Sequence, residues 1–298
     1  MRLVTRGDLD GLTCAVIITS KEDVDDILLV HPQDITDQRV RIMDEDILAN
    51  LPYDPNCAMW FDHHLLTASN ERPTQAFKGR YGLAPSAARL VYEYYLDNDP
   101  TLMRFDKLVT ETDRLDAANL TPSDVSDPKD YILLGFTIDS RTGLGDFRSY
   151  FRKLVENVKT MPIQEVLEQP EVKERIVQMK KEEEELRKAL LRHSRMDGNV
   201  VVSDLRPVEP IPAGNRFLIY TLFPQANVSV RIHWGPQKRF AVAAVGHSIF
   251  NRTCNTSIGE LMSHYGGGGH HGAGTCILPY EKTEEAIEEI VTTLKRNG

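Results

Sequence analysis

The residues Met59–His64 constrain the fold of this chain more than any other stretch. An apolar run, Met-Trp-Phe, stops abruptly at Asp62-His63-His64. Such a run is typical of a buried strand, and in open α/β sheets the polar groups at the carboxyl end of a strand face the ligand. The stretch therefore predicts a strand that delivers three metal-capable side chains to one edge of a sheet. A surface acid beside two ordinary histidines is the alternative that the tripeptide alone leaves open.

An acidic motif also follows the first predicted strand, Arg2–Thr5. Asp8 and Asp10 lie two positions apart in a glycine-containing turn, and the apolar run Leu12–Ile18 that comes next predicts a buried helix. Two acids in such a turn can point at one centre, and the glycines allow a tight backbone. The alternative is a turn that only caps the helix, with Asp10 as the N-cap residue.

Two further strands are predicted at residues 27–30 and 40–43, and the second runs directly into Asp44. Strands that each end in an acid predict a parallel sheet whose carboxyl edge gathers ligands. Clustered carboxylates repel one another unless a cation lies among them, so this edge is expected to bind a metal ion. Either Asp113 or Asp139, each of which follows an apolar segment, could complete the site.

The chain changes character beyond residue 198, where strands are predicted at 199–205, 216–223, 228–234 and 239–246. The segment 228–234 alternates with a period of two, so that Arg231 and His233 share a polar face while the apolar residues face a core. A helix is expected at 257–265, a strand at 275–278 and a last helix at 283–295. Arg231 is thereby a candidate for binding an anion.

A run of four glycines ends at His270. Ordering glycines costs more backbone entropy than ordering other residues, which suggests that the main chain must approach a ligand closely here. The N–H groups of Gly267, Gly268 and Gly269 can surround an anion, and His270 can donate to a phosphate or carboxylate oxygen. A flexible hairpin is the alternative. Arg252 and Asn255, in the segment before this loop, are lesser candidates for substrate contact.

A length of 298 residues allows two cores. The pattern predicts an α/β protein with an N-terminal, mostly parallel sheet flanked by helices, a helical linker, and a smaller C-terminal α/β domain with a mixed sheet. The predicted boundaries are 1–169 for the metal-binding domain, 170–197 for the linker and 198–298 for the substrate-binding domain. The linker contains a charged helix with a thin apolar stripe at 170–193.

Composition narrows the function classes. The net charge of −9 argues against a grip on long nucleic acid, because such binding neutralises many phosphates with Lys and Arg. No apolar run approaches the ~20 residues that a bilayer crossing needs, and the N-terminus lacks a secretory apolar region, so we expect a cytoplasmic protein without a membrane partner. The four cysteines lie far apart and suggest neither a zinc knuckle nor a disulfide framework.

These motifs resemble those of the DHH phosphoesterase family over nearly the whole length of the chain. Asp62-His63-His64 is similar to the motif that names the family, Asp8-Leu9-Asp10-Gly11 to its first acidic motif, and Asp44 to its second. Gly267-Gly268-Gly269-His270 resembles the GGGH signature of the family's smaller C-terminal domain. The order and spacing of the four motifs are more specific than any one of them.

The resemblance implies a centre of one or two divalent ions, usually manganese, with magnesium as the alternative. Carried onto this sequence, it makes Asp44 the bridging ligand, lets Asp8 hold one ion, and assigns the other ion to Asp10, His63 and Asp113. Asp116 and Asp139 are the alternatives to Asp113. Asp62 and His64 are then the implied catalytic residues, with His64 available to contact the phosphate or to protonate the leaving oxygen.

The function implied by the resemblance is metal-dependent hydrolysis of a phosphodiester or phosphoanhydride bond in a short nucleotide-like or polyphosphate substrate, as in exopolyphosphatase-like and oligoribonuclease-like members. Arg231, Gly267–Gly269 and His270 would hold the substrate, with Arg252 and Asn255 as further contacts. A small phosphorylated substrate or short oligonucleotide is the expected partner, and a homodimer is allowed. The family usually has a histidine shortly before the first motif, where this chain has Thr5. The alternative is thus a nucleotide-binding or regulatory protein with a degenerate metal site.

Overall fold

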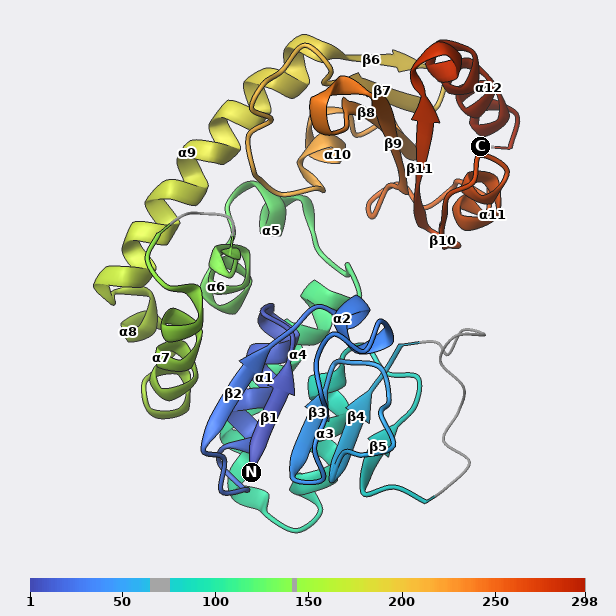
Figure 1. The fold of residues 1–298 in the computed structure, drawn as a ribbon. Helices are drawn as coiled ribbons and strands as arrows, with labels where there is room; N and C mark the ends of the chain where they lie inside the picture. The colour runs from blue at the N-terminus through green and yellow to red at the C-terminus, as the bar shows by residue number, and fades with distance from the viewer. Residues whose placement is uncertain (65–75, 141–143, 298) are drawn as a thin grey trace. The chain divides into compact units, whose positions relative to one another are not determined.

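The computed structural model describes residues 1–64, 76–140 and 144–297 (Figure 1). It contains two compact units. The first comprises residues 1–119 and 128–178, and the second comprises residues 120–127 and 179–298. The long helix α9 (Pro170–His193) contributes residues to both units. Its bounds agree with the charged helix expected at 170–193.

The first unit is built on a five-stranded sheet in which every pair of neighbouring strands is parallel. The strand order is β2-β1-β3-β4-β5. The strands are β1 (Arg2–Thr5), β2 (Asp26–Leu29), β3 (Asp46–Ala49), β4 (Met59–Asp62) and β5 (Gly79–Tyr81). β4 is buried along its length, as the apolar run before Asp62 predicted.

The strand predicted at 40–43 is wrong, because the strand of this region is β3, which starts at Asp46. The apolar residues of 40–43 mislead because Ile42 is buried in a loop, where it packs under the sheet beside Trp60 and Leu48. Asp46 begins the true strand with its carboxylate fully buried and paired with the guanidinium of Arg2 at 2.5 Å. As a consequence, the carboxyl end of β3 is Asn50 and not Asp44.

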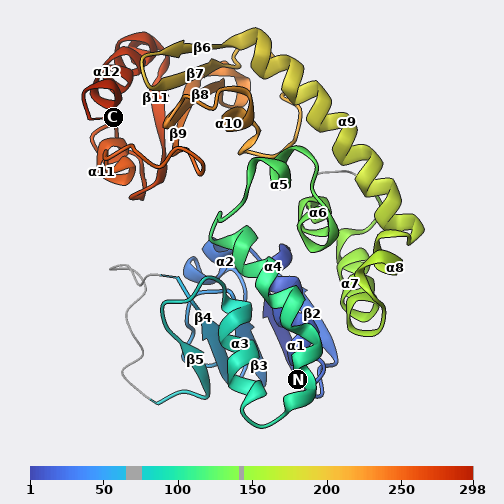
Figure 2. The ribbon, with the colours of Figure 1, turned by 180° about the vertical axis from the view of Figure 1, so that it is seen from behind.

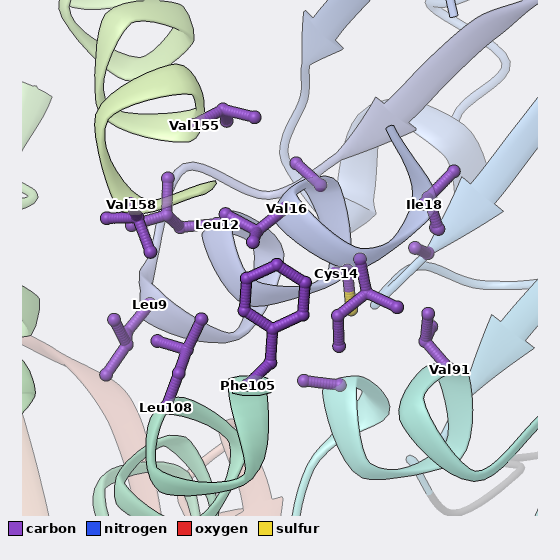
Figure 3. Close-up of a cluster of buried hydrophobic side chains, with 14 of the residues drawn as sticks. Leu9, Leu12, Cys14, Val16, Ile18, Val91, Phe105, Leu108, Val155 and Val158 are labelled. Atoms are coloured by element: carbon purple, nitrogen blue, oxygen red, sulfur yellow. The ribbon is translucent and has the colours of Figure 1, made fainter. Parts of the chain in front are cut away.

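Three helices, α1 (Leu9–Ile18), α3 (Ala87–Leu96) and α4 (Asp106–Asp116), cover one face of this sheet, as Figure 2 shows. Figure 3 shows the core between them, with Leu12 and Val16 of α1 among the side chains of the neighbouring helices. Every residue of α1 is buried. A helix buried on all sides holds its first turn rigidly, which matters because that turn carries Asp10.

The remaining helices of the first unit extend this core. They are α2 (Pro32–Thr36), α6 (Asp130–Thr137), α7 (Phe147–Thr160) and α8 (Ile163–Leu167), together with the 3-10 helix η1 (Pro100–Phe105). α7 packs on α1 through Val155 and Val158 (Figure 3). The small helix α2 belongs to the other face of the sheet, where Ile35 joins the cluster around Trp60.

The second unit contains a six-stranded mixed sheet with the order β10-β11-β9-β8-β7-β6. Only β7 and β8 run parallel, and the other neighbours are antiparallel. The strands are β6 (Ser194–Asp197), β7 (Val200–Asp204), β8 (Val228–Trp234), β9 (Phe240–His247), β10 (Gly268–His270) and β11 (Ala273–Pro279). The alternation predicted for 228–234 is confirmed, because Val228, Val230 and Ile232 are buried in the core.

The helices of the second unit are α5 (Pro122–Ser126), α10 (Leu218–Leu222), α11 (Ile258–Ser263) and α12 (Thr283–Arg296), with the 3-10 helices η3 (Pro236–Lys238) and η4 (Tyr280–Lys282). Helices α11 and α12 supply the apolar side chains that cover the core face of the sheet. The strand predicted at 216–223 is wrong, since this run forms α10. A short apolar run fits a buried helical turn as well as a strand.

The two sheets and the helices around them confirm the predicted α/β fold class. Within the described part of the chain, no helix is both long and apolar enough to span a membrane.

Candidate metal centre

The turn between β1 and α1 places the first acidic motif at the carboxyl edge of the sheet. Asp8 is the N-cap residue of α1, and its Oδ1 accepts a hydrogen bond from the N–H of Gly11 at 2.8 Å. A Cβ on Gly11 would come within 2.1 Å of the carbonyl oxygen of Arg6, so only glycine fits here. The cap is therefore Asp8 and not Asp10, and the side chain of Asp10 is left for another task.

Asp10 is held almost completely inside the protein, with 2% of its surface exposed. Its two carboxylate oxygens accept hydrogen bonds from the N–H groups of Ala87 and Ala88, at 3.0 and 2.7 Å, which are the first residues of α3. Burial raises the pKa of Asp10 well above its usual range, and the charges of Asp116 and Asp8 add to the rise. A cation placed beside a buried carboxylate stabilises its charged form.

His63 follows β4 directly and has a defined tautomer. Its Nδ1 lies 3.0 Å from the carbonyl oxygen of Ala84, which can only accept, so Nδ1 carries the proton in the neutral ring. The Nε2 lone pair is then free. Within the described residues, this Nε2 is buried and has no hydrogen-bond partner. Metal-binding histidines are commonly oriented by a hydrogen bond of this kind from the other ring nitrogen to a backbone carbonyl.

Asp116, at the end of α4, completes a group of three potential ligands. Nε2 of His63 lies 3.3 Å from Oδ2 of Asp116 and 3.8 Å from Oδ2 of Asp10. One ligand atom from each of these residues lies within 4.8 Å of the others. Two neighbouring ligands of an octahedral ion at about 2.1 Å stand about 3 Å apart, so small inward movements suffice to enclose an ion.

The donor set fits a divalent ion. Two carboxylates and one imidazole suit manganese or magnesium, whereas thiolate ligands are typical of zinc sites. The nearest cysteine, Cys14, is buried one turn along α1, with its sulfur 3.8 Å from Oδ1 of Asp10. Burial raises the pKa of Cys14, so the sulfur stays a thiol and is a poor ligand. The unpartnered Nε2 of His63 is the atom that such an ion would satisfy.

The helices α1 and α4 are locked in register by a buried hydrogen bond. Oγ1 of Thr13 lies 2.7 Å from Oγ1 of Thr112, and Thr112 also donates to the carbonyl oxygen of Leu108. Thr13 is three residues after Asp10, and Thr112 is four residues before Asp116. The contact therefore fixes the separation of the two carboxylates, which lie on different helices.

Asp62 and His64 form a separate pair beside this centre. Oδ1 of Asp62 accepts from the N–H of His63 at 2.9 Å and from Nδ1 of His64 at 2.8 Å. Asp62 is buried, and the hydrogen bond that it accepts raises the pKa of His64. His64 is half-exposed, so its imidazole can reach a substrate while Asp62 fixes its orientation.

Three of the predicted metal ligands, Asp8, Asp44 and Asp113, lie outside the group of Asp10, His63 and Asp116. Asp44 is exposed in a turn before β3, at the amino end of a strand whose other end faces Asp8. Asp113 is held by Arg89 at 2.6 Å and by the hydroxyl of Ser86 at 2.6 Å. That network supports the N-terminus of α3, because Ser86 is the N-cap residue of that helix. The structure brings Asp116, the alternative considered for Asp113, into the cluster instead.

The sequence patterns missed Asn50, which occupies the carboxyl end of β3. Its side chain is fully buried, and its Nδ2 donates to Oδ1 of Asp8 at 3.2 Å. Thr5, at the position of the expected histidine, is also fully buried and donates to the carbonyl oxygen of Ala49 at 3.0 Å. A correct boundary for β3 would have revealed Asn50, because the residue after a buried parallel strand lies at the ligand edge.

The glycine run of the second unit forms the hairpin of β10 and β11. A Cβ on Gly267 would lie 2.1 Å from the carbonyl oxygen of Thr275, so this glycine is needed for strand packing. Gly268, in contrast, has no atom within 4 Å of the place where a Cβ would stand, and it pairs with Thr275 of β11. His270 is exposed, and its Nδ1 accepts from the N–H of Gly272 at 3.2 Å. Its Nε2–H remains a donor.

Arg231 lies on the face of the six-stranded sheet opposite the core, between Ser203 of β7 and Ala244 of β9. Arg252 donates from Nε to the carbonyl oxygen of Ile249, and Asn255 donates to that of Thr253, so both stabilise their own loop. Their predicted contacts with substrate stay predictions.

A cavity of about 300 Å³ in the second unit lies elsewhere. Its lining includes Arg192, Arg195, Val202, Arg206, Ile232 and Glu284. Ile232 and Val202 belong to the core face of the sheet, so this cavity opens on the side opposite Arg231. Arg206 is paired with Asp204 at 2.6 Å, and none of the residues predicted to contact the substrate lines this cavity.

Comparison with solved structures finds close similarity. PggH, a pGpG-specific phosphodiesterase from Vibrio cholerae, is 40% identical over 100% of this chain and 99% of its own, with a TM-score of 0.86. The DHH domain of a protein described as a member of a ribosomal protein family has a TM-score of 0.63 at 14% identity over 99% and 87% of the two chains. Exonuclease RecJ bound to manganese has a TM-score of 0.56 at 12% identity over 99% and 90%.

The similarities to the DHH domain and to RecJ, at 14% and 12% identity, concern the fold alone. No model of a known protein family and no curated protein matches the chain.

Proposed function

The chain belongs to the DHH family of metal-dependent phosphoesterases, and on that premise we propose that it hydrolyses the phosphodiester bond of a short linear dinucleotide. The observation that carries the proposal is the buried, unpartnered Nε2 of His63 between the carboxylates of Asp10 and Asp116. We propose these three residues as the ligands of a divalent ion. Manganese is the expected ion, and magnesium is the alternative.

The ion, when bound, supplies positive charge that stabilises the phosphoryl oxygens during in-line attack by water. The chain's own residues hold it in a defined place. The N–H groups of Ala87 and Ala88 fix the orientation of Asp10, and the carbonyl oxygen of Ala84 fixes the tautomer of His63. Because these groups are already fixed, they need not reorganise during the reaction. This preorganisation is the main source of electrostatic catalysis.

We assign the leaving-group proton to His64. In the hydrolysis of pGpG, water adds to phosphorus, the bond to the 3′ oxygen breaks, and two molecules of GMP form. The 3′ oxygen needs a proton, and the half-exposed imidazole of His64 can supply one. Asp62 holds that imidazole from Nδ1 at 2.8 Å, so the acidic proton is the one on Nε2. Asp62 is thereby a positioning residue.

A dinucleotide of the pGpG type is the substrate that we infer, since PggH is specific for pGpG and is 40% identical to this chain. In the second unit, Arg231, the main chain at Gly268 and the Nε2–H of His270 are the proposed contacts with the phosphate groups. Guanidinium, backbone N–H and imidazole N–H groups are suitable donors to phosphate oxygens.

The test is a product analysis with the full chain, pGpG and manganese. We expect GMP as the only product, formed in a reaction that chelation by EDTA abolishes and that His63→Ala lowers at least about 100-fold. Arg80→Gln is the matched control, because Arg80 pairs with Glu93 on the surface and should leave turnover unchanged. Undiminished turnover of the His63→Ala variant would refute the assignment of the centre.

A further inference from the structure

Two residues near the three proposed ligands, Asn50 and Arg6, have side chains without negative charge. Asn50 is at the carboxyl end of β3, and Arg6 lies between β1 and α1. Both contact the same carboxylate, Asp8, through different oxygens. Nδ2 of Asn50 lies 3.2 Å from Oδ1, and Nε of Arg6 lies 3.1 Å from Oδ2. Together with Gly11, they use both oxygens of Asp8 within the protein.

Besides its contact with Asp8, Asn50 has an unusual backbone conformation and an unpartnered side-chain oxygen among the described residues. Its backbone adopts a left-handed conformation with φ of 59°, which asparagine tolerates better than most residues. Its side chain is fully buried, and its Oδ1 has no hydrogen-bond partner among the described residues. An unsatisfied buried amide oxygen is costly, so a donor or a cation beside it would be stabilising.

Arg6 brings a permanent positive charge to the centre. Its side chain is one-third exposed, and its contact with Asp8 uses Nε. Through this contact, Arg6 lies beside the turn that carries Asp10. The two terminal nitrogens of its guanidinium can donate to an incoming oxyanion.

The sum of charges favours one divalent ion. Asp8, Asp10 and Asp116 contribute three formal negative charges. Arg6 supplies one positive charge, so a single divalent ion makes the centre neutral. A second divalent ion would leave an excess of two positive charges before substrate arrives, and it would compete with Arg6 for Asp8.

We propose that the guanidinium of Arg6 takes the place of a second cation, so that this centre binds one divalent ion at Asp10, His63 and Asp116. Asn50 is then a neutral neighbour at the carboxyl end of β3, where a carboxylate would add negative charge for another ion. This inference rests on the proposed function and deepens it. Arg6 then contacts the phosphoryl group directly, and Asp8 serves to position Arg6.

The first experiment counts manganese ions bound to the full-length chain by isothermal titration calorimetry and by electron paramagnetic resonance. We expect one ion per chain and the signal of an isolated Mn²⁺. Two ions with a spin-coupled signal would overturn the inference while leaving the proposed function intact. No bound ion at all would overturn both the inference and the proposed function.

The second experiment tests the two residues. The double variant Arg6→Gln, Asn50→Asp is expected to bind a second ion and to show spin coupling, because it gains a carboxylate and loses the competing cation. Asn50→Asp is nearly isosteric, and aspartate also tolerates positive φ, so folding should persist, as melting curves would verify. A double variant that folds and still binds a single ion would contradict the roles given to Arg6 and Asn50.

The single variant Arg6→Gln separates a contact with substrate from a structural role. It is expected to bind manganese more tightly, by about tenfold, since a positive neighbour is removed, and yet to turn over pGpG at least about tenfold more slowly. A merely structural defect would weaken both properties. Arg80→Gln should change neither, and loss of metal affinity in Arg6→Gln would contradict the inference.

Discussion

The Nδ1 of His63 lies 3.0 Å from the carbonyl oxygen of Ala84, and this contact decides which nitrogen of the ring can bind a metal ion. Because the carbonyl accepts the only proton of the neutral ring, the Nε2 lone pair faces Asp10 and Asp116. Ala84 lies three residues before α3, the helix whose N-terminus also holds Asp10. One segment thus orients two of the three proposed ligands.

We propose Asp116, and not Asp113, as the acidic ligand supplied by α4. Asp116→Asn is expected to lower manganese affinity and turnover at least about 100-fold, because a direct ligand is lost. Its metal-free melting temperature should stay the same or rise, since the carboxylate there is repelled by Asp10 and Asp8. Calorimetric titration and thermal melting measure the two effects.

Asp113→Asn is the matched variant on the same helix. It breaks the ion pair with Arg89 and is expected to lower the free energy of unfolding by about 1–3 kcal/mol while changing manganese affinity less than about tenfold. The opposite pattern, with metal binding lost in Asp113→Asn and kept in Asp116→Asn, would restore the original prediction from the sequence.

Asp44 is expected to be dispensable. Asp44→Ala should change turnover of pGpG less than about twofold, because the side chain is exposed at the amino end of β3, and surface substitutions of this kind have small effects. Steady-state kinetics at saturating manganese provides the measurement. A loss of more than about tenfold would mean that Asp44 acts in the centre after all.

The pair of Asp62 and His64 predicts a pH dependence. The hydrogen bond to Asp62 raises the pKa of His64, so the protonated imidazole is present below that raised value and is lost as the pH rises through it. Asp62→Asn should move the alkaline limb of the kcat profile to lower pH and reduce kcat by about 10²-fold or more, with KM little changed. An unchanged limb would exclude His64 as the proton donor.

Much of the first unit could be predicted from its sequence, because buried parallel strands such as β4 are short apolar runs that end at polar residues. The same rule misplaced β3. The loop containing Ile42 is apolar because it packs under Trp60, and this burial is invisible before the fold is known. Taking 40–43 as the strand put Asp44 at the ligand edge and hid Asn50.

The sequence alone could not decide between Asp113 and Asp116 as the acidic ligand. Both acids follow the same apolar stretch, and one helical turn separates them. What decides is the register of α4 against α1, which depends on the contact between Thr13 and Thr112. Arg89, on a third helix, then pairs with Asp113. Contacts between residues far apart in the chain carry no local signal.

Metal binding should stabilise the protein in a pH-dependent manner. Burial raises the pKa of Asp10, so the stability that its protonated form gives the metal-free protein is present at low pH and is lost as the pH rises through the raised value. Manganese replaces the proton, so the rise in melting temperature that it produces should be larger at about pH 7.5 than at about pH 5.5. Differential scanning calorimetry measures this, and an equal shift at both values would contradict the burial of an ionised Asp10.

The most direct test of the centre is an anomalous difference map, recorded at the manganese absorption edge from crystals of the full chain grown with manganese. We expect a peak bonded to Nε2 of His63 and to carboxylate oxygens of Asp10 and Asp116, at about 2.1–2.3 Å. A map with no peak at these three residues, or with its peak at Asp44 or Asp113, would contradict the assignment of the centre.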